Sequence, residues 1–256
     1  MLASQRQERI LAEIKGRGAA RIADLVGEFD VSGMTVRRDI AELARKGLVR
    51  RVHGGAIDSR RAAYEPGFQA KSELAGAEKA AIARAALGLV RPGNAIALSA
   101  GTTTHMFARL LADCDVRPLT VLTNSLRAGD ALHRPADSQL TVVLTGGTRT
   151  PSDALVGPLA TQALAGLRVD LTFLGVHGLD VETGLTTPNL LEAETDRAMV
   201  AAAGRLIVLA DHTKWGVTGL SRIADLAEVD VLVTDAVPDD VDVRGLEILL
   251  APTDGA

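Results

Sequence analysis

Residues 31–56 of this 256-residue chain read VSGMTVRRDIAELARKGLVRRVHGGA, and this stretch is the most informative about the structure of the N-terminal part. Ser32 is a good N-cap for the helical pattern that follows, and Gly47 ends that pattern. The predicted helix turns three apolar residues inward: Val36, Ile40 and Leu43. The extended stretch 48–52 then leads to the glycines of 53–56. We expect a helix followed by a strand and the tip of a hairpin.

Two shorter helical patterns lie upstream of this stretch. Each has apolar residues at helical spacing, namely Ile10, Leu11 and Ile14 in one and Ile22, Leu25, Val26 and Phe29 in the other. Two helices joined by a short turn, with a wing behind them, would place the third helix in the DNA major groove. Its exposed first turns carry Thr35, Arg37 and Arg38, and arginine can read guanine or neutralise phosphates. Periodicity alone fits a small helical bundle with solvated arginines equally well.

The composition is that of a globular protein whose charge is distributed unevenly along the chain. Apolar residues make up 47 % and aromatic residues 2 %, which disfavours both disorder and stacking platforms for single-stranded nucleic acid. Residues 1–60 hold 12 Lys and Arg against 8 Asp and Glu, whereas the remainder carries a net charge of −8. A basic N-terminal part on an acidic body fits a nucleic-acid module joined to something else, although the excess of +4 is modest.

No feature of the sequence predicts a membrane protein or a metalloprotein. Cys114 is the only cysteine, so an intrachain disulfide or a cysteine-based zinc site is excluded. His, Asp and Glu show no metal-ligand spacing, and we expect neither a metal nor a cofactor. The N-terminal residues lack the apolar core of a signal peptide, and no apolar stretch reaches the length of a membrane span. We therefore expect a cytoplasmic protein.

Strand and helix patterns alternate after residue 78. The predicted strands are 95–98, 119–122, 140–144, 170–175, 206–209 and 231–234, and the predicted helices are 79–90, 103–111, 125–132, 159–167 and 190–203. Such alternation predicts an α/β domain with a Rossmann-like, mainly parallel sheet that is covered on both faces. Ligands bind such sheets at the carboxyl ends of their strands.

Five polar clusters stand at those strand ends. They are residues 99–104, 123–125, 146–149, 178–180 and 211–214. The first, SAGTTT, combines free backbone N–H groups, hydroxyls and a helix start, which favours a phosphate. It lacks the lysine and spacing of a Walker A loop, so an NTPase is disfavoured. Each cluster alone fits a simple helix cap, but five of them would converge on one rim.

The N-terminal stretch closely resembles the signature of the DeoR family of bacterial transcriptional regulators. The residues that carry the resemblance are 31–40, Leu43, 47–50 and 52–56. It implies a winged helix-turn-helix that binds double-stranded operator DNA, and implies that Asp39 supports an arginine. From the residues and the resemblance together, the candidate DNA-binding residues are Ser32, Thr35, Arg37, Arg38, Arg50, Arg51 and His53.

The body resembles the effector domain of the same family, which is related to sugar-phosphate isomerases of the ribose-5-phosphate type. The resemblance implies a phosphorylated sugar or sugar derivative as effector, with residues 101–104 as the phosphate cradle. The candidate effector-binding residues are Lys79, Ser99, Gly101, Thr102, Thr103, Thr104, Thr123, Asn124, Ser125, Gly146, Gly147, Arg149, Gly175, His177, Asp180, Glu192, Asp211 and Lys214. Ser99 stands where the family usually has Asp, and the missing carboxylate would change which sugar hydroxyl is read or would admit a more anionic ligand.

A sugar-phosphate isomerase with an accessory DNA-binding part is the alternative. The related isomerases carry a carboxylate where this chain has His177, while Asp180, Glu192 or Lys214 could still supply acid–base groups. We expect a regulator without catalytic residues. We expect it to be a repressor and to work as a homo-oligomer. The predicted organisation is a DNA-binding domain at 1–57, a linker at 58–76 and an effector domain at 77–256.

Overall fold

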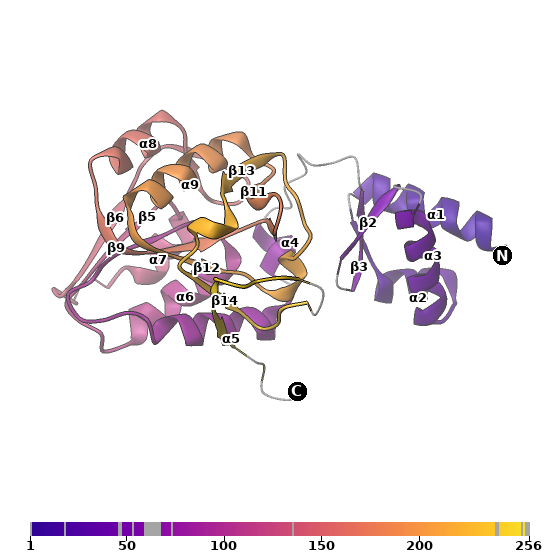
Figure 1. Cartoon of the computed structure of the whole chain (residues 1–256), viewed down its shortest axis with the longest axis horizontal. Helices are drawn as coiled ribbons and strands as arrows, with labels where there is room; N and C mark the ends of the chain where they lie inside the picture. The colour runs from indigo at the N-terminus through magenta and orange to yellow at the C-terminus, as the bar shows by residue number, and fades with distance from the viewer. Residues whose placement is uncertain are drawn as a thin grey trace. The chain divides into compact units, whose positions relative to one another are not determined.

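The computed structural model describes residues 2–17, 19–45, 48–52, 54–58, 68–72, 74–134, 136–238, 241–251 and 253 (Figure 1). The chain forms two compact units, Met1–Tyr64 and Glu65–Ala256, called here the head and the sensor domain. In the described part of the chain, no helix is both long and apolar enough to cross a membrane.

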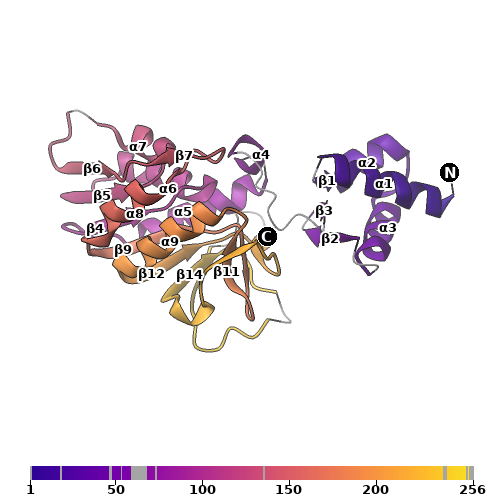
Figure 2. The same cartoon turned by 90° about the horizontal axis from the view of Figure 1, so that it is seen from above.

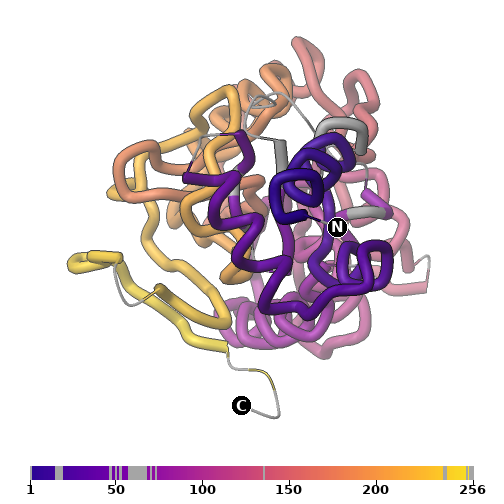
Figure 3. The backbone as a smooth tube through the Cα atoms, turned by 90° about the vertical axis from the view of Figure 1, so that its right-hand side faces the viewer, coloured from indigo at the N-terminus to yellow at the C-terminus, as the bar shows by residue number. Residues whose placement is uncertain are grey.

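The head is a winged helix-turn-helix, as predicted, and is drawn in indigo in Figure 3. Its elements are α1 (Ala3–Arg17), β1 (Ala19–Arg21), α2 (Ile22–Phe29), α3 (Gly33–Arg45), β2 (Val49–Val52) and β3 (Gly55–Asp58). The strands form an antiparallel sheet in the order β1-β3-β2. The core contains the apolar positions read from the sequence, among them Ile10, Ile14, Leu25, Val36, Ile40 and Leu43.

Gly55 is required by the close approach of two strands in the head. A Cβ atom at this position would lie 2.3 Å from the backbone oxygen of Ala20 on β1. The neighbouring Gly54 has a φ of +80°, which L side chains rarely adopt. Both glycines of the His-Gly-Gly-Ala string therefore shape the hairpin and its contact with β1.

The sensor domain is built on seven parallel strands. Their order across the sheet is β15 (Glu247–Leu250), β14 (Val231–Thr234), β12 (Ala203–Leu209), β9 (Val169–Gly175), β4 (Ala95–Leu98), β5 (Leu119–Thr123) and β6 (Leu140–Leu144). Figure 2 shows the strands from β6 to β14 side by side in this order. The sequence order reverses between β4 and β9. This point is the topological switch point, where open α/β sheets bind ligands.

Helices cover both faces of this sheet (Figure 1). On one face lie α5 (Gly76–Leu87), α6 (Thr102–Asp113) and α7 (Leu126–Leu132), and on the other α8 (Pro158–Ala165) and α9 (Leu190–Ala202). Alternation along β4 explains this layering, because Ile96 and Leu98 pack with the first group and Ala97 packs with the second. The central strands, from β14 to β5, are therefore largely buried, as their continuous apolar runs predict, whereas the edge strands β6 and β15 are more exposed.

Several short elements were not predicted from the sequence. They include β1 of the head, the edge strand β15 of the main sheet, and α4 (Phe68–Ser72). They also include a three-stranded antiparallel sheet of β10 (Gly178–Asp180), β11 (Gly184–Thr187) and β13 (Ser221–Ala224), and a two-stranded ladder of β7 (Thr148–Arg149) and β8 (Leu155–Val156). The helix α4 lies inside the expected linker 58–76 but packs against α6 of the sensor domain.

Candidate functional site

The helix α3 presents the candidate DNA-reading residues on an exposed surface. Ser32 is the N-cap of α3, since its Oγ accepts a hydrogen bond from the Thr35 N–H at 3.2 Å and lies 2.9 Å from the Thr35 hydroxyl. Arg37 and Arg38 are exposed, and Met34 beside them is 76 % exposed. Ser32 therefore sets where the helix starts, and the arginines are available to a ligand outside the head.

A buried ion pair holds α3 against α1. The Arg6 Nε donates to Asp39 Oδ2 at 2.5 Å, and the Gln7 side chain donates to Asp39 Oδ1 at 3.1 Å. Asp39 is 3 % exposed, so its carboxylate faces the core of the head rather than a DNA surface. Asp39 thus supports an arginine, and that arginine is Arg6 of the first helix.

The hairpin of the head carries the other candidate DNA contacts. Arg51 lies on β2, pairs with Ala56 of β3 and has an exposed side chain. Arg50 pairs with Ile57 in the same ladder. His53 lies outside the described residues, so its place in the site stays a prediction.

The second site is a pocket at the switch point of the sensor domain. Its lining comes from six segments that are far apart in sequence, and consists of Phe68, Lys71, Ala100, Gly101, Thr102, Thr103, Ser152, Gly175, Val176, His177, Thr187, Glu192, Asp196, Leu209 and Lys214. The carboxyl ends of β4 and β9 lie side by side here. The pocket therefore stands where the strand order predicts a ligand.

One wall of the pocket is suited to an anion. Gly101 precedes α6 without a side-chain cap, and Gly101, Thr102 and Thr103 line the cavity. The N–H groups of a first helical turn bind anions well, because they lack partners within the helix. A Cβ on Gly101 would lie 3.0 Å from the hydroxyl of Thr104, which is itself fully buried and donates to the Gly101 carbonyl.

Lysine side chains add positive charge to this wall. Lys214 lines the pocket, and burial lowers its pKa, with Asp211 opposing the shift and Lys71 adding to it. Lys79 does not line the pocket. Its ammonium donates to the carbonyls of Lys71, at 2.6 Å, and Leu74, at 2.5 Å, and burial lowers its pKa to about 8. Lys79 therefore holds the segment around α4. Its charge acts on the pocket at a distance, without direct contact with the cavity.

The pocket lining also carries carboxylates. Glu192 on α9 accepts hydrogen bonds from the hydroxyls of Thr150, at 2.9 Å, and Thr187, at 3.4 Å. Asp196 lines the pocket one helical turn further along α9, and His177 lines it from the loop after β9. Carboxylates accept hydrogen bonds from hydroxyl groups, so the pocket can bind a ligand with an anionic end and a hydroxylated end.

Four other predicted residues tie the strand ends together. The Ser99 Oγ accepts from the Gly175 N–H at 2.9 Å, which joins the loops after β4 and β9 across the switch point. Asn124 accepts from the Ala100 N–H at 2.8 Å, and Thr123 donates to the Leu98 carbonyl at 2.8 Å. Ser125 caps α7 through the Ala128 N–H. These side chains shape the rim without lining the pocket.

The remaining predicted residues also lie outside the pocket lining. Gly147, just before β7, allows a close approach to β8, because a Cβ there would lie 2.5 Å from the backbone oxygen of Val156. Gly146 precedes it and has a φ of +72°. Arg149 forms an ion pair with Asp153. Asp180 and Asp211 stabilise turns. The Asp180 carboxylate accepts hydrogen bonds from two backbone N–H groups after β10, and the Asp211 carboxylate accepts one from the Thr213 N–H.

Five polar or aromatic lining residues were missed by the sequence analysis: Phe68, Lys71, Ser152, Thr187 and Asp196. Asp196 could have been found, because it lies four residues after Glu192 on the same helical face. Lys71 and Phe68 carry no such local signal. Among the described residues, no group of three His, Cys, Asp or Glu side chains is placed to hold a metal ion.

Comparison with protein families identifies both units. Residues 6–60 match the DeoR-like helix-turn-helix domain, and residues 75–236 match the DeoR C-terminal sensor domain. The chain belongs to the DeoR family. A helix-turn-helix of this family implies DNA binding, and a sensor domain implies a small-molecule effector.

Curated DeoR-family relatives match along nearly the whole chain. A putative aga operon transcriptional repressor of Escherichia coli O157:H7 is 34 % identical, over 96 % of this chain and 93 % of that protein. The transcriptional repressor AccR of Agrobacterium fabrum is 36 % identical, over 90 % and 89 %. An L-fucose operon activator of Haemophilus influenzae is 32 % identical, over 92 % and 94 %. These relatives are named as regulators of transcription, which agrees with the prediction of a regulator rather than an enzyme.

This DeoR-family chain also has distant likenesses among solved structures. Ribose 5-phosphate isomerase A of Methanocaldococcus jannaschii is 20 % identical, over 54 % of this chain and 53 % of that one, with a TM-score of 0.39.

Proposed function

We propose that this protein represses a carbohydrate-metabolism operon and leaves its operator when a phosphorylated sugar or sugar derivative binds the switch-point pocket. The observation that carries the proposal is the mixed character of the pocket lining. Lys214 and the uncapped first turn of α6 can bind an anion, and the carboxylates of Glu192 and Asp196 can accept hydrogen bonds from hydroxyl groups. A sugar phosphate matches both, since its phosphate accepts charge-assisted hydrogen bonds and its hydroxyls donate them.

The names of the relatives support the carbohydrate part of the proposal. One relative is named for the L-fucose operon and another for the aga operon. One of these is an activator and the other a repressor, so the sign of regulation rests on our proposal alone. The operator would be read by a dimer or a larger oligomer, because helix-turn-helix proteins bind paired half-sites. An effector can release such an assembly only if it prefers the state that does not bind DNA.

The test is DNA release by a panel of ligands. Fluorescence anisotropy with DNA from the promoter region next to the gene measures operator binding by the full chain. We expect a subset of pentose and hexose phosphates to release the DNA, and the matching free sugars to fail. A thermal shift should single out the same compounds, since a ligand at about 100 times its Kd stabilises the folded state by about 2.7 kcal/mol. Release by free sugar as effective as release by its phosphate would refute the proposed phosphate recognition.

Substitutions in the first turn of α6 test whether this turn binds the phosphate. Gly101→Ala places a methyl group 3.0 Å from the Thr104 hydroxyl, at the point where a phosphate would approach the backbone. We expect this variant to bind the operator as the wild type does but to require a higher effector concentration for release. Thr103→Val keeps the volume and removes one hydroxyl, so its effect should be smaller. Thr161→Val on α8 is a matched control, because Thr161 is not among the pocket-lining residues and its hydroxyl donates within its own helix turn.

A further inference from the structure

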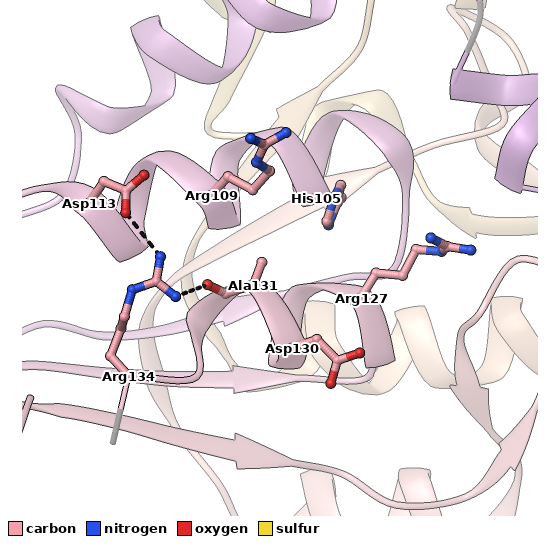
Figure 4. A pocket seen from close by; sticks show the side chains of 7 residues that line it. All are labelled: His105, Arg109, Asp113, Arg127, Asp130, Ala131 and Arg134. Atoms are coloured by element: carbon pink, nitrogen blue, oxygen red, sulfur yellow. Dashed lines mark hydrogen bonds and ion pairs between the residues drawn. The ribbon is translucent and has the colours of Figure 1, made fainter. Parts of the chain in front are cut away.

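The short helix α4 is attached to the sensor domain through an aromatic contact at its start. The Phe68 ring meets the His105 ring edge to face, with centroids 5.6 Å apart, and the Arg127 guanidinium lies 4.0 Å from the Phe68 centroid. Figure 4 shows His105 on α6 and Arg127 on α7 at the same end of the two helices. They border an open groove of about 490 Å³ between α6 and α7. Phe68 therefore docks α4 across both helices.

Lys71 attaches the other end of α4. Its ammonium donates to the Ser152 hydroxyl at 3.0 Å, and its backbone oxygen accepts from the ammonium of Lys79 at 2.6 Å. Lys79 also donates to the carbonyl of Leu74, just beyond α4. Since Lys79 is 1 % exposed, this attachment is anchored in the buried part of α5.

The docked helix α4 is also a wall of the effector pocket. Phe68 and Lys71 both line the cavity, next to the first turn of α6 and to Lys214. Lys71 and Lys214 each lower the pKa of Lys79, and Lys71 lowers that of Lys214, so the three ammonium groups repel one another. Asp211 is the carboxylate that opposes both shifts most strongly. An anion beside Lys71 would reduce this repulsion.

We propose that Lys71 is a ligand of the effector's anionic group, and that anion binding strengthens the docking of α4, which thereby transmits the occupancy of the pocket toward the head. This inference rests on the proposed function of the pocket. A bound phosphate offers Lys71 a charged acceptor, which is a stronger partner than the neutral Ser152 hydroxyl. Because docked α4 completes the pocket wall, ligand binding and α4 docking stabilise each other reciprocally. In the described part of the chain, α4 is the next element after β3, the last strand of the head.

Hydrogen–deuterium exchange of the full-length protein tests the coupling, with inorganic phosphate as the probe. If binding and docking are coupled, exchange of the amides in residues 69–75 should slow by about tenfold at a phosphate concentration near ten times its Kd. Lys71→Met should abolish this protection, and Lys71→Arg should restore most of it. Arg109→Met is the matched control, because it removes an exposed cation from α6 that does not line the effector pocket. Equal protection in the wild type and Lys71→Met, or no protection in the wild type, would overturn the inference.

A second measurement separates this inference from the proposed function. Lys71→Met should bind operator DNA but require at least tenfold more sugar phosphate for release, whereas Arg109→Met should respond as the wild type does. If the wild type and Lys71→Met were released at the same concentration, Lys71 would not be an effector ligand and the proposed function would stand. If no sugar phosphate released the wild type, the proposed function itself would fail.

Discussion

The head and the sensor domain present their candidate binding residues in opposite ways. In the head, Thr35, Arg37 and Arg38 lie within four positions of one helix, and both arginines are exposed. In the sensor domain, the lining residues run from Phe68 to Lys214, and many are buried. The difference follows from the ligands. A DNA groove accommodates a protruding helix, whereas a small anion must be enclosed by groups from several strand ends.

The largest effect is expected where the head depends on a buried charge. Asp39→Ala leaves the Arg6 guanidinium buried without its carboxylate, and breaking such a pair typically costs about 3–5 kcal/mol of unfolding free energy. Urea denaturation followed by circular dichroism should show early unfolding of the head and an unchanged transition of the sensor domain. Arg45→Ala is the control, since its ion pair with Glu42 is exposed and should contribute little. Equal stabilities of the two variants would show that α3 is held by apolar packing alone.

The next effect concerns the exposed arginines of α3. Arg37→Ala or Arg38→Ala should weaken operator binding by about 1–3 kcal/mol if the side chain reads a base, and the loss should depend on the operator sequence. Anisotropy titrations against operators with single base-pair changes make this measurement. Because these residues lie outside the sensor domain, the thermal shift caused by the effector should be unchanged. If both variants fold and bind the operator as tightly as the wild type does, α3 is not the helix that reads the operator.

A pH dependence distinguishes the buried lysines of the sensor domain from the exposed cations of the head. Burial lowers the pKa of Lys79 from 10.5 to about 8. Between these values the unfolded chain binds the proton and the folded chain does not, so stability should rise with pH, by at most about 1.4 kcal/mol per pH unit. Below pH 8 both states are protonated, and this contribution is constant. Denaturation of the wild type and of Lys79→Met between pH 8 and 10 should show that the unfolding free energy rises less steeply with pH in the variant. Identical slopes would contradict the lowered pKa of Lys79.

The smallest effect is expected on the wing. Arg51 is exposed on β2, and a contact with a phosphate carries no sequence information. Arg51→Ala should therefore weaken binding to all DNA sequences to a similar extent and lower the salt slope of the affinity by about 1. Titrations at several salt concentrations, on operator and unrelated DNA, measure both quantities. A loss confined to the operator would instead place Arg51 among the base-reading residues.

The strands that were predicted correctly share a local signal. Residues 95–98 and 140–144 are short apolar runs, and the structure has strands over the same residues. The strands β10, β11 and β13 have no such signal, since they are three or four residues long and contain Gly, Ser and Thr. The pairing of β11 with β13 joins segments 34 to 39 residues apart, such as Thr187 with Ser221 and Leu185 with Ala224. Non-local pairing of this kind cannot be read from periodicity.

Elements whose causes are local could be predicted from the residues alone. The string VSGMTVRRDI contains its own N-cap, inward apolar face and exposed arginines, so α3 and its surface follow from residues within one helix. The alternation of strands and helices likewise indicated a parallel sheet and the edge at which a ligand would lie.

Which polar groups at that edge share a pocket depends on the folded chain. Asn124 and Lys79 looked like ligands in sequence, but their hydrogen bonds hold loops and α4 in place. Lys71, from the expected linker, lies in the pocket beside Lys214. Residues separated by more than a hundred positions are brought together by the sheet, and burial makes each polar group take whichever partner lies within reach. That choice depends on distances in the folded chain, which no local pattern contains.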